Sequence, residues 1–322
     1  MNGLRPVEPT HPKASLVFYL LLGVSFLLLV AFLSAGLFSN GPRLLSANSV
    51  AVVELVGFIS NSGESPFLSE SSVSADGVVE DLESACKNSG IGAVLLKVDS
   101  PGGEITASER IKFAVDACEK PVVSYIESVG ASGAYLASLP ADKILAYPSS
   151  ITADIGVVSE YLEFARLMGE HGVVQRKLSR GEFKGVPDPF SEIPEEKLRE
   201  VFDPILDQLY ASFRDDVVVY RGERLAGSSM EFIESEIANG RPVTGKKALE
   251  LGLIDGLVTS KKEALDEAAA LAGLGEDYQV VEFKKKKGLL ELFSESFFAP
   301  ILSRLDFKSQ LMQAGNPAAF FK

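Results

Sequence analysis

Short runs of aliphatic residues alternate along the chain with segments whose apolar positions recur every three or four residues. The aliphatic runs lie at 50–56, 93–98, 122–126 and 143–146. Nearly continuous runs of this kind are typical of strands buried on both faces of a sheet. Amphipathic segments at 78–86, at 105–118 and directly after Ser132 separate the runs. This alternation predicts an α/β fold of right-handed strand–helix–strand units with a mainly parallel sheet.

The second half of the chain is predicted to be mainly helical. A long apolar stripe at helical spacing begins near Glu195 and continues to Phe213. Pro204 lies inside this stripe and is expected to kink or split the helix. Two shorter helices are predicted at 230–237 and 261–271.

The N-terminal segment has a different character. No charged residue occurs between Lys13 and Arg43, a stretch long enough to cross a hydrocarbon core of about 30 Å. We expect a cytoplasmic tail over 1–13, one transmembrane helix serving as a signal anchor over 14–38 and a linker over 39–48, followed by an extracytoplasmic domain over 49–283. A signal peptide cleaved near Gly36 is the alternative, although its apolar region would exceed the roughly 7–15 residues usual for such peptides.

Charge limits the classes of partner. The net charge of the chain is −13, which argues against nucleic acid because phosphate binding requires clustered Lys and Arg. The tail over 284–322 opens with four lysines and continues with leucine and phenylalanine in an amphipathic pattern. Such a tail can lie on a membrane surface or dock on the protein, and the pattern does not distinguish the two.

The chain has two cysteines, too few for a disulfide framework. Cys86 and Cys118 each fall on the apolar face of a predicted helix, so we expect buried thiols. A single disulfide in an oxidising compartment is the alternative. The two histidines are far apart in the sequence, no metal-ligand cluster is evident and no cofactor is indicated.

Ser132 is the candidate nucleophile. It lies in Gly130-Ala131-Ser132-Gly133-Ala134-Tyr135, after a predicted strand, where a tight strand-to-helix turn would project its hydroxyl. The alternative is a small residue selected for close helix packing. A nucleophilic serine needs a base, and His11 precedes the predicted anchor while His171 stands alone in a polar turn. Lys184 is therefore the candidate base, because Phe183 and Val186 would desolvate it and lower its pKa; a solvated loop lysine is the alternative.

A second motif, Asp99-Ser100-Pro101-Gly102-Gly103, joins a predicted strand to a predicted helix. Glycine lets backbone N–H groups approach a ligand closely, and acyl transfer requires such donors at the oxyanion. By itself the motif is more typical of a plain loop. Next to a candidate serine, it favours the catalytic interpretation.

These motifs together resemble the signal peptide peptidase A family, in its short, membrane-anchored bacterial form. The resemblance runs from about Val50 to Asp255 and includes Arg180-Gly181-Glu182-Phe183-Lys184 and Gly240-Arg241-Pro242-Val243-Thr244-Gly245. It implies a Clp/crotonase-like fold of repeated ββα units and assembly into a homo-oligomeric ring. It also implies a Ser-Lys dyad of Ser132 and Lys184, with the amides of Gly103 and Gly133 as the oxyanion hole. The implied substrates are remnant signal peptides and other apolar extended peptides at the bacterial inner membrane, cleaved without a cofactor.

One position departs from the family pattern. Where the family usually has a serine that orients the lysine, this chain has Asp154, in Ala153-Asp154-Ile155-Gly156-Val157. A carboxylate beside Lys184 would favour the charged ammonium, so Asp154 is expected to modulate the lysine and to reduce its efficiency as a base at neutral pH.

Three other functions compete with this interpretation. An acyl-CoA enzyme of the crotonase type would share the fold but has no use for a signal anchor. A related Ser-Lys membrane protease that acts on a stomatin-like partner has the same chemistry. The third alternative is a catalytically silent scaffold of the same fold, and Asp154 is its only support in the sequence.

Overall fold

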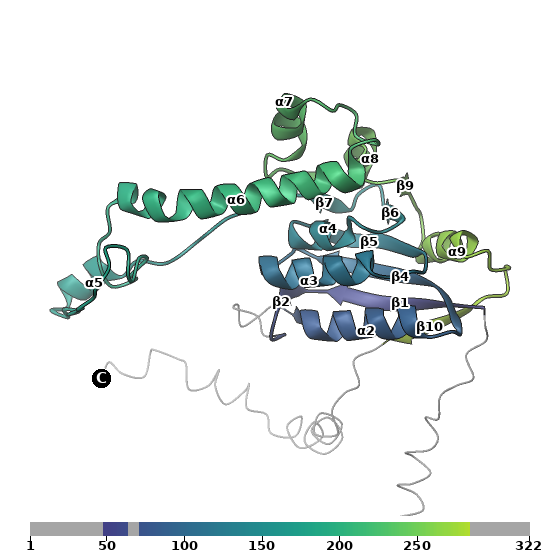
Figure 1. Cartoon of the computed structure of the whole chain (residues 1–322), viewed down its shortest axis with the longest axis horizontal. Helices are drawn as coiled ribbons and strands as arrows, with labels where there is room; N and C mark the ends of the chain where they lie inside the picture. The colour runs from purple at the N-terminus through teal and green to yellow at the C-terminus, as the bar shows by residue number, and fades with distance from the viewer. Residues whose placement is uncertain (1–47, 64–70, 284–322) are drawn as a thin grey trace, which may run out of the picture. The chain divides into compact units, whose positions relative to one another are not determined.

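The computed structural model describes residues 48–63 and 71–283 (Figure 1). Its sheet has the order β10-β1-β4-β5-β6-β9, with β7 paired to β5. These strands are β1 (Ser49–Val56), β4 (Ile91–Ser100), β5 (Val122–Ala131), β6 (Lys143–Ala146), β7 (Ile151–Ala153), β9 (Gly256–Leu257) and β10 (Gln279–Phe283). Every pairing among them is parallel, which confirms the predicted sheet; β8 (Pro242–Thr244) is antiparallel to β7.

Helices cover both faces of this sheet, which explains why its strands are apolar without alternation. Side chains of Val50, Leu95 and Tyr125 pack with α9 (Lys261–Leu271) on one face. On the other face lie α2 (Ala75–Lys87), α3 (Ile105–Asp116) and α4 (Gly133–Ser138), which run side by side in Figure 1. The hydroxyl of Ser124 on β5 donates to that of Ser138 on α4 across this second interface (2.9 Å). A short parallel pair, β2 (Phe58–Ser60) and β3 (Ser72–Ser74), precedes α2.

The second half contains the predicted helices together with features that were not predicted. The helix α6 (Glu195–Arg221) is continuous, so the expected split at Pro204 is wrong. Its C-terminal half is held by contacts to the core, including Lys112 Nζ to Asp216 at 2.6 Å. The remaining elements are α5 (Ala165–Glu170), α7 (Met230–Phe232), a π-helical turn (Ile233–Ile237) and α8 (Gly245–Leu251).

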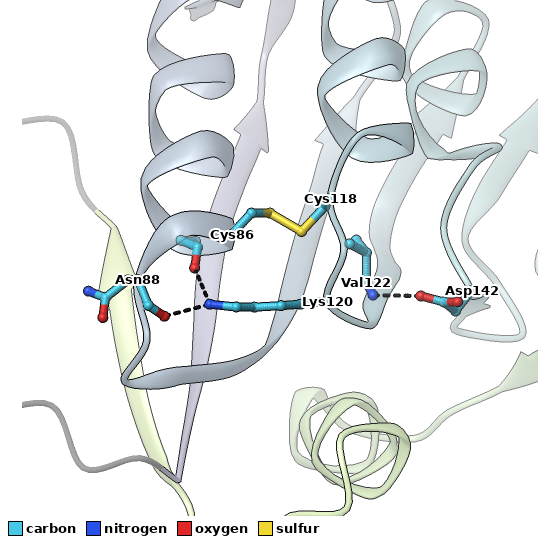
Figure 2. Close-up of a disulfide and its surroundings, with 7 residues drawn as sticks. Cys86, Asn88, Cys118, Lys120, Val122 and Asp142 are labelled. Atoms are coloured by element: carbon cyan, nitrogen blue, oxygen red, sulfur yellow. Dashed lines mark hydrogen bonds between the residues drawn. A yellow bond between two sulfur atoms is a disulfide. The ribbon is translucent and has the colours of Figure 1, made fainter.

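Cys86 and Cys118 form a disulfide, so the expectation of free buried thiols is wrong (Figure 2). Cys86 is in the last turn of α2, and Cys118 follows the end of α3 at Asp116 rather than lying within that helix. Their Cα atoms are 5.5 Å apart. The ammonium of Lys120 donates to the carbonyls of Ala85 and Asn88 at the end of α2, and burial lowers the pKa of this lysine. The sequence pattern placed both cysteines on neighbouring helices but did not predict their pairing.

The predicted anchor over 14–38, with its flanking segments over 1–13 and 39–47, lies outside the described residues, as does the tail over 284–322. Among the helices that the structure describes, none has the length and apolar character needed to span a membrane.

Candidate active site

Ser132 occupies the turn between β5 and α4. Its backbone has φ 50° and ψ −123°, a conformation rarely adopted by residues other than glycine. Such a backbone costs on the order of 1–3 kcal/mol and persists only where the surroundings enforce it. Here the Ser132 amide donates to the carbonyl of Ala153 at the end of β7 (2.8 Å), and the Ser132 carbonyl accepts from Leu136 in α4 (3.0 Å). The turn therefore holds Ser132 in the sharp strand-to-helix bend that exposes a nucleophilic hydroxyl.

The loop after β4 brings the amide of Gly103 to this turn. Ile59 donates to the carbonyl of Gly102 (2.9 Å) and accepts from the amide of Glu104 (2.8 Å), as in a parallel bridge. In that pattern the bridged residue, Gly103, directs its own amide to the opposite side. A Cβ on Gly103 would lie 2.0 Å from the Ile59 carbonyl oxygen, so only glycine allows this approach.

The amide of Gly133, at the start of α4, lies close to the amide of Gly103. A Cβ added to Gly133 would lie 3.4 Å from the Gly103 nitrogen and 2.2 Å from Ser108 Oγ on α3. A Cβ on Gly102, whose φ is 102°, would lie 2.8 Å from the Gly133 nitrogen. Close packing of the two glycine segments therefore places two backbone donors next to Ser132, which is the arrangement that an oxyanion requires.

A cavity opens at Ser132. Its volume is about 320 Å³, and its lining includes Gly103, Ile105, Asp154 and Val157. A narrower cavity on the side of α6 also reaches Ser132 and is bordered by Leu209 and Phe213. The aliphatic side chains of Ile105 and Val157 line both cavities, so each cavity at Ser132 has an aliphatic part in its wall.

Asp154 lies on the wall of the larger cavity and, like the preceding Ala153, has a positive φ, 55° and 67° respectively. Aspartate tolerates this left-handed conformation better than most residues, which gives one physical reason for an aspartate at this position. Partial burial raises the pKa of its carboxyl above the ordinary value. The structure thus brings Asp154 and Ser132 to the same cavity, whereas Lys184, beside which the sequence analysis expects Asp154, does not line it.

Lys184 is not among the residues that line either cavity at Ser132. It lies in the irregular segment between α5 and α6, where its amide donates to Gly181 (3.2 Å) and its side chain is exposed. Phe183 is exposed as well, and Lys197, rather than Lys184, lies over its ring at 5.7 Å. The expected desolvation of Lys184 by Phe183 and Val186 is therefore wrong for the single chain.

His171, the other base considered, is exposed in the same segment and lines neither cavity at Ser132. In the described ranges, 48–63 and 71–283, no group of three or more His, Cys, Asp or Glu side chains is arranged to hold a metal ion.

Comparison with known proteins identifies the family. The model of peptidase family S49 matches residues 114–275. A putative protease of Methanocaldococcus jannaschii is 33% identical over 67% of this chain and 67% of its own length. A putative signal peptide peptidase of Enterococcus faecium is 28% identical over 74% of this chain and 68% of its own.

Several longer curated relatives are matched over only 29 to 42% of their own length. A solved structure, a mutant of the 1510-N membrane-bound stomatin-specific protease, aligns with 74% of this chain and 99% of that chain at a TM-score of 0.45 and 14% identity. The family match includes Ser132 and spans half of the sequence. The chain belongs to peptidase family S49 and is a serine peptidase.

Proposed function

We propose that this peptidase is a membrane-bound endopeptidase that uses a Ser-Lys dyad, with Ser132 as the nucleophile and Lys184 as the general base. The observation that carries the proposal is the strained backbone of Ser132, which lines both cavities and lies beside the closely packed segments of Gly103 and Gly133. A strained serine beside two backbone amides is the arrangement expected for acyl transfer.

The base is proposed to come from a neighbouring copy of the chain. Lys184 lines no cavity at its own Ser132, and its segment exposes large apolar side chains: Val173 is 52% exposed, Val174 77% and Leu178 98%. Exposed apolar residues at this density indicate an interaction surface. In a heterologous ring, the same contact repeated around the axis would cover this surface and carry Lys184 to the next Ser132. Burial there would desolvate the lysine and favour its neutral form.

In the proposed reaction, neutral Lys184 takes the proton from the Ser132 hydroxyl as the oxygen attacks the scissile carbonyl. The amides of Gly103 and Gly133 stabilise the resulting oxyanion. When the C–N bond breaks, the protonated lysine gives its proton to the leaving amine and an acyl-enzyme forms. Water, deprotonated by the same lysine, then attacks the ester, and the lysine returns this proton to the Ser132 oxygen as the acyl–oxygen bond breaks.

The proposed substrates are remnant signal peptides and other apolar peptides at a bacterial inner membrane, with the catalytic domain outside the cytoplasm. Ile105 and Val157 contribute aliphatic surface to both cavities at Ser132, and one relative is named as a putative signal peptide peptidase. The Cys86–Cys118 disulfide supports an oxidising compartment. The uncharged segment over 14–38 would provide the membrane anchor.

The dyad is tested by Ser132→Ala and Lys184→Ala, with His171→Ala as the matched control from the same exposed segment. Each dyad variant is expected to reduce hydrolysis of an apolar peptide by at least about 10³-fold, because nucleophile and base act as one unit. The control should retain parental activity. Labelling by a serine-reactive fluorophosphonate should disappear in Ser132→Ala. Full activity in either dyad variant, or loss only in His171→Ala, would remove the proposed dyad.

A further inference from the structure

The loop over 252–255, which joins α8 to β9, takes no part in the proposed chemistry, yet it forms a tightly bonded junction. Gly252 ends α8 in the left-handed conformation, with φ 79°, and a Cβ there would lie 1.9 Å from the carbonyl oxygen of Arg224. The amide of Asp255 donates to Ile144 on β6 (2.8 Å), and one Asp255 carboxylate oxygen accepts from the Ile144 amide (2.7 Å). The loop over 252–255 is thus fixed to the start of β6.

Arg221, at the C-terminal end of α6, fastens the same loop from the other side. It is 1% exposed. Its guanidinium donates to both carboxylate oxygens of Asp255 (2.8 and 3.0 Å) and to the carbonyl of Gly252 (3.0 and 3.2 Å). A buried bidentate pair with further hydrogen bonds fixes geometry strongly. The loop over 252–255 therefore has one defined position relative to α6.

Tyr135 connects this loop to the nucleophile. Its side chain is fully buried, and its hydroxyl donates to the carbonyl of Leu253 at 2.7 Å. Burial raises the pKa of Tyr135, so the hydroxyl stays protonated and remains a donor. Tyr135 belongs to the first turn of α4, the six-residue helix that begins at Gly133 directly after Ser132. Such a short helix has little stability of its own, so its orientation depends on contacts of this kind.

We propose that Tyr135 is a positioning residue for catalysis: its hydrogen bond to Leu253, in a loop clamped by Arg221 and Asp255, fixes α4 so that Ser132 and the Gly133 amide face the scissile carbonyl. The proposal rests on the proposed role of Ser132 as nucleophile. It gives a catalytic reason for Tyr135 in the serine motif and for the bonded loop over 252–255. The same clamp holds α6, whose Leu209 and Phe213 border the narrower cavity.

The chain supplies a matched control for this hydroxyl. Tyr125, on β5, is also fully buried, but its hydroxyl has no hydrogen-bond partner among the described residues. It packs in the cluster with α9, on the opposite face of the sheet from α4. Tyr135→Phe and Tyr125→Phe therefore remove the same atom from equally buried rings, and only the first removes a hydrogen bond.

The experiment uses the full-length protein in detergent and measures the rate constant of fluorophosphonate labelling, kcat, KM and Tm for both variants. Tyr135→Phe should label about tenfold more slowly and lose kcat to the same extent, with KM within about twofold of the parent, because a small displacement of reacting groups is costly. Tyr125→Phe should label at the parental rate. Asp255→Asn, which weakens the clamp without emptying the position, should slow labelling in the same direction and serves if Tyr135→Phe does not fold.

A Tyr135→Phe variant that labels at the parental rate, even with a lowered Tm, would overturn the proposal, because the hydrogen bond would then be purely structural. Equal slowing in Tyr125→Phe would overturn it too. Failure of the proposed function would be recognised separately, because the parent protein itself would then not be labelled.

Discussion

At the scale of single residues, Asp154 has two properties that affect Lys184 as the proposed base. It lines the cavity at Ser132, and its backbone adopts a left-handed conformation. A carboxylate near the ammonium of Lys184 would stabilise the charged lysine, which cannot accept the proton of the Ser132 hydroxyl. The activity of the parent enzyme is therefore expected to increase with pH well beyond neutrality.

Replacing Asp154 with the serine typical of the family should move this increase toward neutral pH and raise turnover there. Asp154→Asn is the sharper variant, because asparagine tolerates positive φ and preserves shape while removing charge. The test is to measure the rate of peptide hydrolysis as a function of pH for both variants and for the parent. If Asp154 instead orients the lysine, both variants should lose activity at every pH, and an unchanged profile would mean that Asp154 does not approach Lys184.

Unfolding of the same variants provides a control that does not depend on Lys184. Because the pKa of Asp154 is raised in the folded state, the folded protein holds this proton more tightly than the unfolded chain. The parent should therefore lose stability relative to Asp154→Asn as pH rises from the ordinary value of 3.8 through the raised pKa. Outside that window the difference in the free energy of unfolding between the parent and Asp154→Asn should be constant. Equilibrium unfolding at several pH values measures this difference.

At the scale of elements, the disulfide joins α2 to the segment after α3, and α3 begins directly after the loop that contains Gly103. The two cysteines are separated by 32 positions, and closing a loop of that length typically contributes about 2–4 kcal/mol. Cys86→Ser combined with Cys118→Ser should therefore lower the free energy of unfolding by about 2–4 kcal/mol.

Denaturant unfolding with and without a reductant measures this contribution. The reductant should destabilise the parent to a similar extent and leave the double serine variant unaffected. Equal stability of the parent in both conditions would mean that the disulfide contributes nothing to the fold.

Sequence pattern predicted the elements well where burial is nearly continuous, as in β1, β4 and β5, and where it follows the helical period, as in α9. It was less successful where the outcome depends on tertiary contacts. Pro204 does not split α6, which is helical on both sides of the proline. Cys86 and Cys118 each looked like an ordinary apolar position, and only the packing of α2 against α3 brings them into bonding distance.

The same difference between local pattern and tertiary contact applies to the residues of the predicted site. Ser132, Gly103, Gly133 and Asp154 lie in turns that end strands, where motif and backbone conformation agree, and the fold brings them together. Lys184 lies in a segment that is exposed in the single chain, so no pattern along one chain identifies its surroundings. Tyr135 and Asp255 are 120 positions apart and meet only through the loop over 252–255.

At the scale of the whole molecule, the proposed ring predicts complementation between two inactive variants. In a random 1:1 mixture of Ser132→Ala and Lys184→Ala, one neighbouring pair in four unites an intact serine with an intact lysine, so activity should recover to about a quarter of the parental value. Mixed oligomers, confirmed by differential tags, are assayed against each variant alone. A monomer by light scattering, or no recovery in confirmed mixed oligomers, would refute the shared site and favour a lysine delivered within one chain.

The pairing of β10 with β1 has a consequence for biosynthesis. Ser49 lies opposite Gln279 and Val53 opposite Phe283, so one of the first strands to be synthesised receives its outer neighbour from the end of the described chain. Contacts of such large sequence separation form slowly, because a long loop must close before they contribute. Until residue 283 has emerged, β1 presents an unpaired edge of the kind that recruits other chains. A nascent chain that stalls before β10 is therefore prone to aggregate through the exposed edge of β1. Pairing of β10, the last strand of the described residues, covers this edge.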